Sequence, residues 1–206
     1  MEKIVLVGFG GHAKSVIDTI EQCSEFQIVG FSDVTSQFQK EYRGYKVICS
    51  DDALFDIYKS GIKYAFITIG YMGQSSIREK IYNKLKQIGF IIPVIIDKSA
   101  IIARDVILEE GTFVGKNVVL NSQVYVNKLA IINTGAIIEH ECNIGQNSHI
   151  AGGSILCGNV TVCDNVFVGA GSKIIQNITV GSNTIIGAGS VVLHNVKQNS
   201  KVYGLI

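Results

Sequence analysis

The sequence places a histidine and a glutamate side by side, His140 and Glu141, with a second histidine nine residues later at His149. A histidine that faces solvent exchanges protons near neutral pH, and an adjacent carboxylate can orient and polarise its ring. The pair is therefore a candidate general base. The alternative is a solvated pair at a surface corner with no chemical role.

The elements that position this pair follow from a repeat of six residues. Every sixth residue from Ile96 to Val192 is Ile, Leu or Val, and four residues after each stands an apolar or small side chain. Six residues do not match the 3.6-residue helical turn, and a single strand of this length would need a period of two. The pattern predicts a solenoid of short strands and tight corners, in which three repeats close one triangular coil of 18 residues.

In this solenoid the buried aliphatic Ile138 would direct His140 and Glu141 outward at a corner. One coil beyond His140 lies Gly158, and adjacent strands are about 4.8 Å apart. A glycine there would leave open space beside the ring, and a backbone N–H that could stabilise the oxyanion of a tetrahedral intermediate. The alternative for Gly158 is a plain corner glycine. His149 lies half a coil from His140, so the two histidines would meet only across a subunit contact.

Glycines and cysteines have structural explanations in the same frame. Glycines follow the aliphatic where the backbone has little room, at Gly115, Gly145, Gly169, Gly181 and Gly187. Cys142 occupies an inward small position and should be inaccessible, which argues against a covalent intermediate on its thiol. The five cysteines are odd in number and lack CxxC spacing, so we expect free thiols and neither a disulfide framework nor a metal site.

The two halves of the chain differ in composition. Asp, Glu, Lys and Arg number 21 in the first 96 residues and 14 in the last 110, which predicts domains at 1–96 and 97–206. In the first domain, expected strands at 3–8, 27–32 and 64–69 alternate with expected helices at 12–22, 53–59 and 75–88, the second capped by residues 50–52. This alternation predicts a Rossmann-like α/β domain with a small parallel sheet.

The turn after the first strand carries glycines at Gly8, Gly10 and Gly11. It departs from the GxGxxG dinucleotide fingerprint because Ala13 stands at the last position, so it is weak evidence for NAD. The formal net charge is +1, which argues against a nucleic-acid partner. No apolar stretch approaches the roughly 20 residues of a membrane span, and no signal pattern opens the chain, so we expect a cytoplasmic protein.

The repeat gives the C-terminal half a resemblance to the left-handed parallel β-helix of hexapeptide-repeat acyltransferases. With the N-terminal segments 7–13 and 29–33, the segment 138–145 and His149, the whole chain resembles the sugar O- and N-acyltransferases. Within them it is more similar to the UDP-4-amino-sugar N-acetyltransferases of the bacillosamine pathway than to the sialic-acid O-acetyltransferases. The former share the His-Glu pair and the second histidine nine residues after the first.

The resemblance implies a role for each candidate residue. His140 would be the base and Glu141 its orienting partner. Gly158 would leave room for the acyl group of a thioester and would hold the thioester oxygen through its N–H. His149 of a neighbouring chain would contact the acetyl donor, acetyl-CoA, in a groove that runs towards Gly169 and Gly187. The nucleotide-sugar would be bound by Gly10, Gly11, His12 and Asp33, with Gly70 in the segment 70–73 as a pocket wall and Asn133 as a hydrogen-bonding partner of the sugar.

The function expected from these residues is transfer of acetyl from acetyl-CoA to the C4 amine of a UDP- or dTDP-linked 4-amino-4,6-dideoxy sugar, for surface glycan biosynthesis. We expect a homotrimer and no metal or redox cofactor. O-acetylation of a sugar hydroxyl, sialic acid included, is the alternative within enzymes. A non-catalytic trimeric scaffold that binds a nucleotide-sugar is the alternative outside them.

Overall fold

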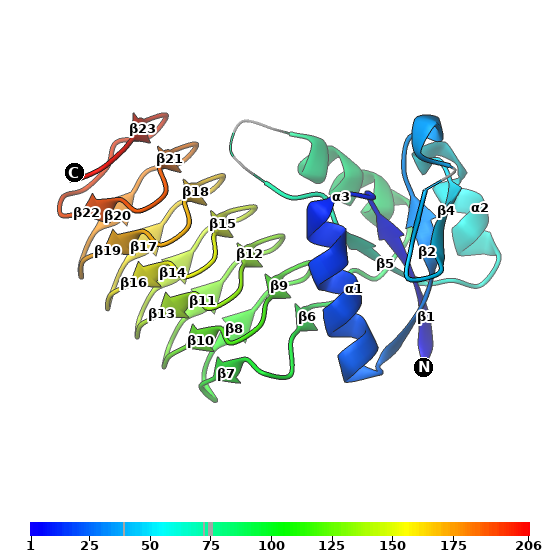
Figure 1. Cartoon of the computed structure of the whole chain (residues 1–206), viewed down its shortest axis with the longest axis horizontal. Helices are drawn as coiled ribbons and strands as arrows, with labels where there is room; N and C mark the ends of the chain where they lie inside the picture. Colours follow the sequence, from blue (N-terminus) through cyan, green and yellow to red (C-terminus); the bar gives the residue numbers. More distant parts are fainter. Residues whose placement is uncertain (39, 72, 74–75) are drawn as a thin grey trace. The chain divides into compact units, whose positions relative to one another are not determined.

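The computed structural model describes residues 1–38, 40–71, 73 and 76–206. The chain divides into two compact units (Figure 1), the first formed by residues 1–70 and 76–95 and the second by 96–206 together with Tyr71 and Gly73. The first is an α/β domain and the second a left-handed parallel β-helix, which confirms the predicted fold class.

The first unit contains a five-stranded sheet of order β3-β4-β2-β1-β5. Its strands are β1 (Glu2–Val7), β2 (Phe26–Ser32), β3 (Glu41–Tyr42), β4 (Tyr45–Cys49) and β5 (Tyr64–Ile67). All neighbours pair in parallel except β3 and β4. The helices are η1 (Thr35–Gln37), α1 (Gly11–Cys23), η2 (Asp51–Ala53), α2 (Leu54–Lys59) and α3 (Ile77–Ile88).

Two details of this unit differ from the sequence prediction. The hairpin β3–β4 was not predicted, although Arg43 and Gly44 between its strands both have positive φ, as a two-residue hairpin turn requires. Ser50 is the N-cap of η2, but its side chain makes no capping hydrogen bond. The third helix begins at Ile77, and Ser75, its predicted start, lies outside the described residues.

The second unit consists of three parallel sheets that run along the stacked coils (Figure 1), with orders β22-β19-β16-β13-β10-β7, β20-β17-β14-β11-β8 and β23-β21-β18-β15-β12-β9-β6. Paired residues are 18 apart from β7 to β22, as in Val119 with Ile137, which confirms the predicted coil. The 18-residue spacing is lost after β22, because Ile185 of β21 pairs with Lys201 of β23, a shorter separation.

Each strand of these sheets has two residues. They are β6 (Ile95–Ile96), β7 (Ile101–Ile102), β8 (Ile107–Leu108), β9 (Phe113–Val114), β10 (Val119–Leu120), β11 (Tyr125–Val126), β12 (Ile131–Ile132), β13 (Ile137–Ile138), β14 (Asn143–Ile144), β15 (His149–Ile150), β16 (Ile155–Leu156), β17 (Thr161–Val162), β18 (Phe167–Val168), β19 (Lys173–Ile174), β20 (Thr179–Val180), β21 (Ile185–Ile186), β22 (Val191–Val192) and β23 (Lys201–Val202).

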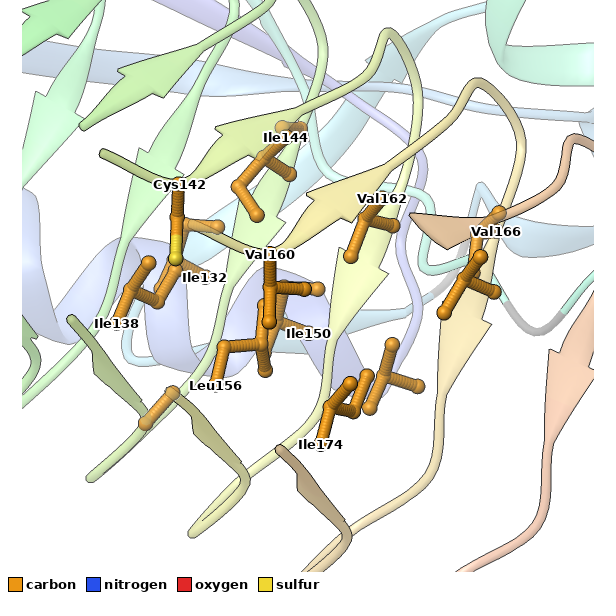
Figure 2. Packing of buried hydrophobic residues seen from close by; sticks show 14 of the residues in the cluster. Ile132, Ile138, Cys142, Ile144, Ile150, Leu156, Val160, Val162, Val166 and Ile174 are labelled. Carbon is orange, nitrogen blue, oxygen red and sulfur yellow. The ribbon is translucent and has the colours of Figure 1, made fainter. Parts of the chain in front are cut away.

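The repeated aliphatic residues fill the inside of the coils. From Val114 to Val192 every one of them is at most 1% exposed, and Figure 2 shows several of them packed together with Cys142, Val160 and Val166. Most hydroxyls at the small inward positions donate to a carbonyl of the next coil, as Ser148 Oγ does to Cys163 at 2.8 Å, whereas Ser190 Oγ donates to the Gly187 carbonyl of its own coil. Burial of these polar atoms therefore leaves them hydrogen-bonded.

The corners of the β-helix share one backbone conformation. From Gly111 to Gly189 every sixth residue has positive φ, a conformation that favours Gly and Asn. The N–H of this residue donates to the residue before the equivalent position one coil earlier, as Asn159 does to the His140 carbonyl at 2.8 Å. Eleven of the fourteen positions are Gly or Asn, and the exceptions are Gln123, Leu129 and Glu141.

Glycines that follow the aliphatic pack against the next coil, as predicted. A Cβ on Gly145, Gly169 or Gly181 would lie 2.4 Å from a backbone atom of that coil. All five cysteines are free. No helix within the described part of the chain is long and apolar enough to cross a membrane.

We predict that Gly145→Ala destabilises the β-helix by about 1–3 kcal/mol, because its Cβ meets backbone that has no room to move. The matched control is Gly135→Asn. Gly135, unlike Gly145, has positive φ and open space around it, and Asn117 stands at the equivalent corner one coil earlier. Urea unfolding should show the control within about 0.5 kcal/mol of wild type. Equal stability of the two variants would contradict this explanation of the glycine.

Candidate active site

His140 and Glu141 form the corner between β13 and β14, and their side chains are 59% and 57% exposed. His140 Nδ1 lies 2.9 Å from Glu141 Oε2. A carboxylate can only accept, so Nδ1 carries the proton and Nε2 presents its lone pair to solvent. The carboxylate also stabilises the imidazolium that forms when Nε2 takes a proton. This geometry suits a general base.

Gly158 lies directly against the His140 ring. A Cβ at Gly158 would be 2.5 Å from Cε1 and 2.6 Å from Nε2 of His140. The space that we expected the acyl group to use is therefore occupied by the imidazole, which brings Nε2 beside the Gly158 backbone. The Gly158 carbonyl accepts from the Asn177 N–H at 3.1 Å, while its own N–H makes no hydrogen bond to any described residue. That N–H remains available to an anionic oxygen.

Glu141 occupies its corner at a conformational cost. Its φ is +61°, at the position where most coils have Gly or Asn. A glutamate in this region costs about 1 kcal/mol more than those residues. Glu141 was predicted as a site residue only because it is the neighbour of His140. Its departure from the Gly or Asn pattern is a second, independent signal, and it is visible in the six-residue repeat of the sequence.

His149 is the outward residue of β15, in the seven-stranded sheet. His140 lies at the corner between the six-stranded and five-stranded sheets, which is opposite that face. One chain therefore does not bring the two histidines together. The structure does bring His149 to Asn133, whose Nδ2 is 3.4 Å from His149 Nε2. Asn133, the predicted sugar ligand, thus belongs to the surroundings of the second histidine.

Gly169 and Gly187 have packing reasons for lacking a side chain. A Cβ on Gly169 would lie 2.4 Å from the Ala188 nitrogen, and one on Gly187 would lie 2.2 Å from the Tyr203 ring. Their proposed contact with the acetyl donor is therefore not needed to explain the glycines. It stays a prediction.

Gly10 and Gly11 are different. Neither has positive φ, and a Cβ on either would meet nothing within 4 Å. Gly10 is the N-cap of α1, where backbone N–H groups attract anions. By contrast Gly8 has φ +104° and its Cβ would lie 2.3 Å from the Ile69 side chain. The absence of side chains at Gly10 and Gly11 thus leaves space for a ligand. At Gly8 the positive φ and the close Ile69 side chain already require glycine.

His12 and Gly70 are neighbours in this unit, since a Cβ on Gly70 would lie 3.8 Å from the His12 Cβ. Met72, in the segment predicted as a pocket wall, lies outside the described residues. Asp33 uses both carboxylate oxygens locally. Oδ2 accepts from the Phe9 N–H at 2.5 Å and Oδ1 from the Val34 N–H at 2.6 Å. Asp33 therefore orders the turn that contains Gly10, and a nucleotide contact would use its remaining lone pairs.

A cavity of about 250 Å³ lies beside the same turn, and most of its lining was not predicted from the sequence. Gly10 and Gly11 contribute to it together with Lys14, Lys40 and Tyr42. The Lys14 ammonium is 5.2 Å from the centre of the Tyr42 ring. Tyr42 belongs to the unpredicted strand β3, so its proximity to α1 could not be inferred. Two lysines beside glycines suit an anionic ligand.

Cys142 is 1% exposed, and its Sγ donates to the Cys157 carbonyl at 3.1 Å. Burial raises the pKa of its thiol to about 11. The thiolate that nucleophilic catalysis requires is therefore scarce near neutral pH. This thiol is a poor acyl acceptor.

Comparison with known proteins gives matches over both units. The PglD N-terminal domain model matches residues 3–85, and the bacterial transferase hexapeptide model, which describes six repeats, matches residues 141–176 and 159–194. PerB from Caulobacter crescentus, solved with CoA and GDP-perosamine, is 33% identical, with a TM-score of 0.92 over 99% of this chain and 95% of that chain.

Two further solved structures are similar over nearly the whole chain. The acetyltransferase domain of PglB from Neisseria gonorrhoeae, in complex with acetyl coenzyme A, is 26% identical, with a TM-score of 0.90 over 98% of this chain and 96% of that chain. WeeI from Acinetobacter baumannii is 22% identical, with a TM-score of 0.86 over 99% and 97%, and it supports the fold.

A β/α domain joined to a β-helix with a His-Glu corner pair defines a hexapeptide-repeat acyltransferase. The 33% sequence identity to PerB, over 99% of this chain and 95% of that chain, places the protein in a narrower family within this class. The chain belongs to the PglD-like family of sugar N-acetyltransferases.

We predict that Glu141→Asn makes the protein more stable and less active. Asn relieves the positive φ by about 1 kcal/mol, while loss of the carboxylate leaves the imidazolium unsupported and lowers kcat about tenfold or more. Urea unfolding and steady-state kinetics on the same preparation measure both effects. A variant that loses both stability and activity would show that Glu141 has a structural role instead.

Proposed function

We propose that the protein transfers the acetyl group of acetyl-CoA to the C4 amine of a nucleotide-linked 4-amino-4,6-dideoxy sugar. The observation that carries this proposal is the exposed His140 ring, held through Nδ1 by Glu141 with Nε2 beside the Gly158 backbone. Membership of the sugar N-acetyltransferase family supports an amine as acceptor. Formation of a surface glycan component is the role we propose for the product.

The proposed reaction is a direct attack. The sugar amine adds to the thioester carbonyl carbon as His140 Nε2 accepts a proton from the nitrogen. The carbonyl oxygen becomes an oxyanion, and the Gly158 N–H is the donor that we assign to it. When the tetrahedral intermediate collapses, the C–S bond breaks and the imidazolium returns the proton to the departing CoA thiolate. Burial of Cys142 supports this path over an acyl-enzyme.

The nucleotide-sugar is proposed to bind the first unit. Gly10 and Gly11 leave space at the N-terminus of α1 for phosphate, and Lys14 and Lys40 supply positive charge to the adjoining cavity. The nucleotide base stays open. UDP and dTDP were expected from the sequence, and PerB was solved with GDP-perosamine, so all three nucleotides belong in a substrate test.

We further propose that the active site is shared between chains. His140 of one chain and His149 of another would flank the acetyl donor, because within one chain they lie on a corner and on the face opposite it. A closed trimer supplies three such pairs. We also place the protein in the cytoplasm, where acetyl-CoA and nucleotide-sugars are available.

An activity assay tests the reaction. Thiol release from acetyl-CoA should occur with at least one 4-amino sugar linked to UDP, dTDP or GDP, and His140→Ala should reduce kcat by about 100-fold or more. Turnover with sialic acid alone would favour the O-acetyltransferase alternative. Binding of a nucleotide-sugar with no turnover on any acceptor would favour the scaffold.

Sedimentation equilibrium tests the shared site. We expect a particle of three times the 22.3 kDa chain mass over the concentrations used in kinetics. A fully active monomer would overturn the proposal, because His149 would then be unable to reach the same acetyl donor as His140.

A further inference from the structure

Two of the polar contacts of His149 bear on which ring nitrogen carries its proton. Nδ1 lies 2.6 Å from the backbone carbonyl oxygen of Tyr71. A carbonyl oxygen only accepts hydrogen bonds, so Nδ1 is the donor. In the neutral ring the other nitrogen, Nε2, is then an acceptor.

The contact on the opposite side of the ring requires the same arrangement. Asn133 Oδ1 accepts from the Thr134 N–H at 2.8 Å, and only the oxygen of that amide can do so. The Asn133 NH₂ group therefore faces His149 Nε2, at 3.4 Å. A proton on Nε2 would place two donors face to face. Both neighbours thus select the neutral ring with its proton on Nδ1.

Tyr71 is itself firmly held. Its side chain is 2% exposed, and its hydroxyl donates to the Asn165 carbonyl at 2.8 Å. The Phe167 ring stands edge-on to the His149 ring, with centroids 5.2 Å apart. The carbonyl that receives the Nδ1 proton therefore has a fixed position, and the His149 ring has little freedom to turn.

We infer that Tyr71 is a positioning residue that holds His149 with Nε2 as a hydrogen-bond acceptor. An N–H group of the acetyl donor would replace the long 3.4 Å contact with Asn133 on the single lone pair of Nε2. The N–H groups available in acetyl-CoA along its narrow arm are the amides of the pantetheine unit. The acetyl carbonyl is an acceptor and finds no donor on a neutral His149 Nε2. This inference rests on the proposed function for the identity of the donor, but the proton position of His149 does not depend on it.

The assignment changes what His149 does for the reaction. A contact with the pantetheine arm is the same before and during acetyl transfer, so it contributes equally to the ground state and the transition state. Loss of such a contact raises KM and leaves kcat nearly unchanged. Contact with the acetyl carbonyl would instead strengthen as the oxyanion forms, and its loss would lower kcat.

The first experiment is a long-range ¹H–¹⁵N spectrum of the uniformly labelled protein, in which the two neutral forms of a histidine ring differ. We expect His149, identified by the signals absent from His149→Gln, to carry its proton on Nδ1. A proton on Nε2 would overturn the inference whatever the protein's activity. Tyr71→Phe should give a mixture of both forms, and Tyr125→Phe, which removes a hydroxyl bonded to Glu109 elsewhere on the β-helix, should not.

The second experiment compares calorimetric binding of CoA and acetyl-CoA to wild type, His149→Ala and His149→Gln. We expect His149→Ala to weaken both ligands about tenfold, the loss of roughly one hydrogen bond, and His149→Gln, whose amide oxygen can accept, to recover part of it. KM for acetyl-CoA should rise with little change in kcat. Weakening of acetyl-CoA alone, or of neither ligand, would overturn the acceptor role. If wild type bound neither, the proposed function would fail while the spectrum still decided the proton position.

Discussion

The stacking of 18-residue coils, each bonded to the next through its corners, is the constraint on which the rest of the β-helix depends. It places equivalent residues of successive coils about 4.8 Å apart, so what stands above a side chain is determined by the residue 18 positions later. His140 has Gly158 above it, and its ring lies where any larger residue would clash. The chemistry of the corner therefore follows from two residues that are distant in sequence.

His140 and His149 illustrate how one hydrogen bond to a histidine ring determines the role of its other nitrogen. Each donates through Nδ1 to an oxygen, which leaves the lone pair of the neutral ring on Nε2. The oxygen beside His140 belongs to a carboxylate, whose charge stabilises the protonated ring that a base must become. The oxygen beside His149 is a neutral carbonyl, and an amide NH₂ faces the other nitrogen. That environment favours a ring that remains neutral.

Much of this arrangement could be predicted from the sequence because a strict period encodes it. The inward positions, the coil length, the corner location of His140 and the proximity of Gly158 all follow from counting residues. The left-handed backbone at Glu141 could also be predicted from the six-residue period, because Asn or Gly occupies most of the equivalent positions. The contact of His149 with Tyr71 could not be predicted, because it joins residues 78 apart with no repeat between them. Strand β3 and the cavity residue Tyr42 were missed for the same reason, as the first unit has no internal period.

The central claim is that His140 is the base for a nucleophilic amine beside the Gly158 backbone. A crystal structure of the protein with CoA and a nucleotide-linked 4-amino sugar measures this most directly. The account predicts the sugar nitrogen within hydrogen-bonding reach, about 3 Å, of His140 Nε2, with the CoA sulfur next to Gly158 of the same chain and the pantetheine arm on His149 of a neighbouring chain. A sugar nitrogen placed against another titratable group, with His140 facing only solvent, would contradict it.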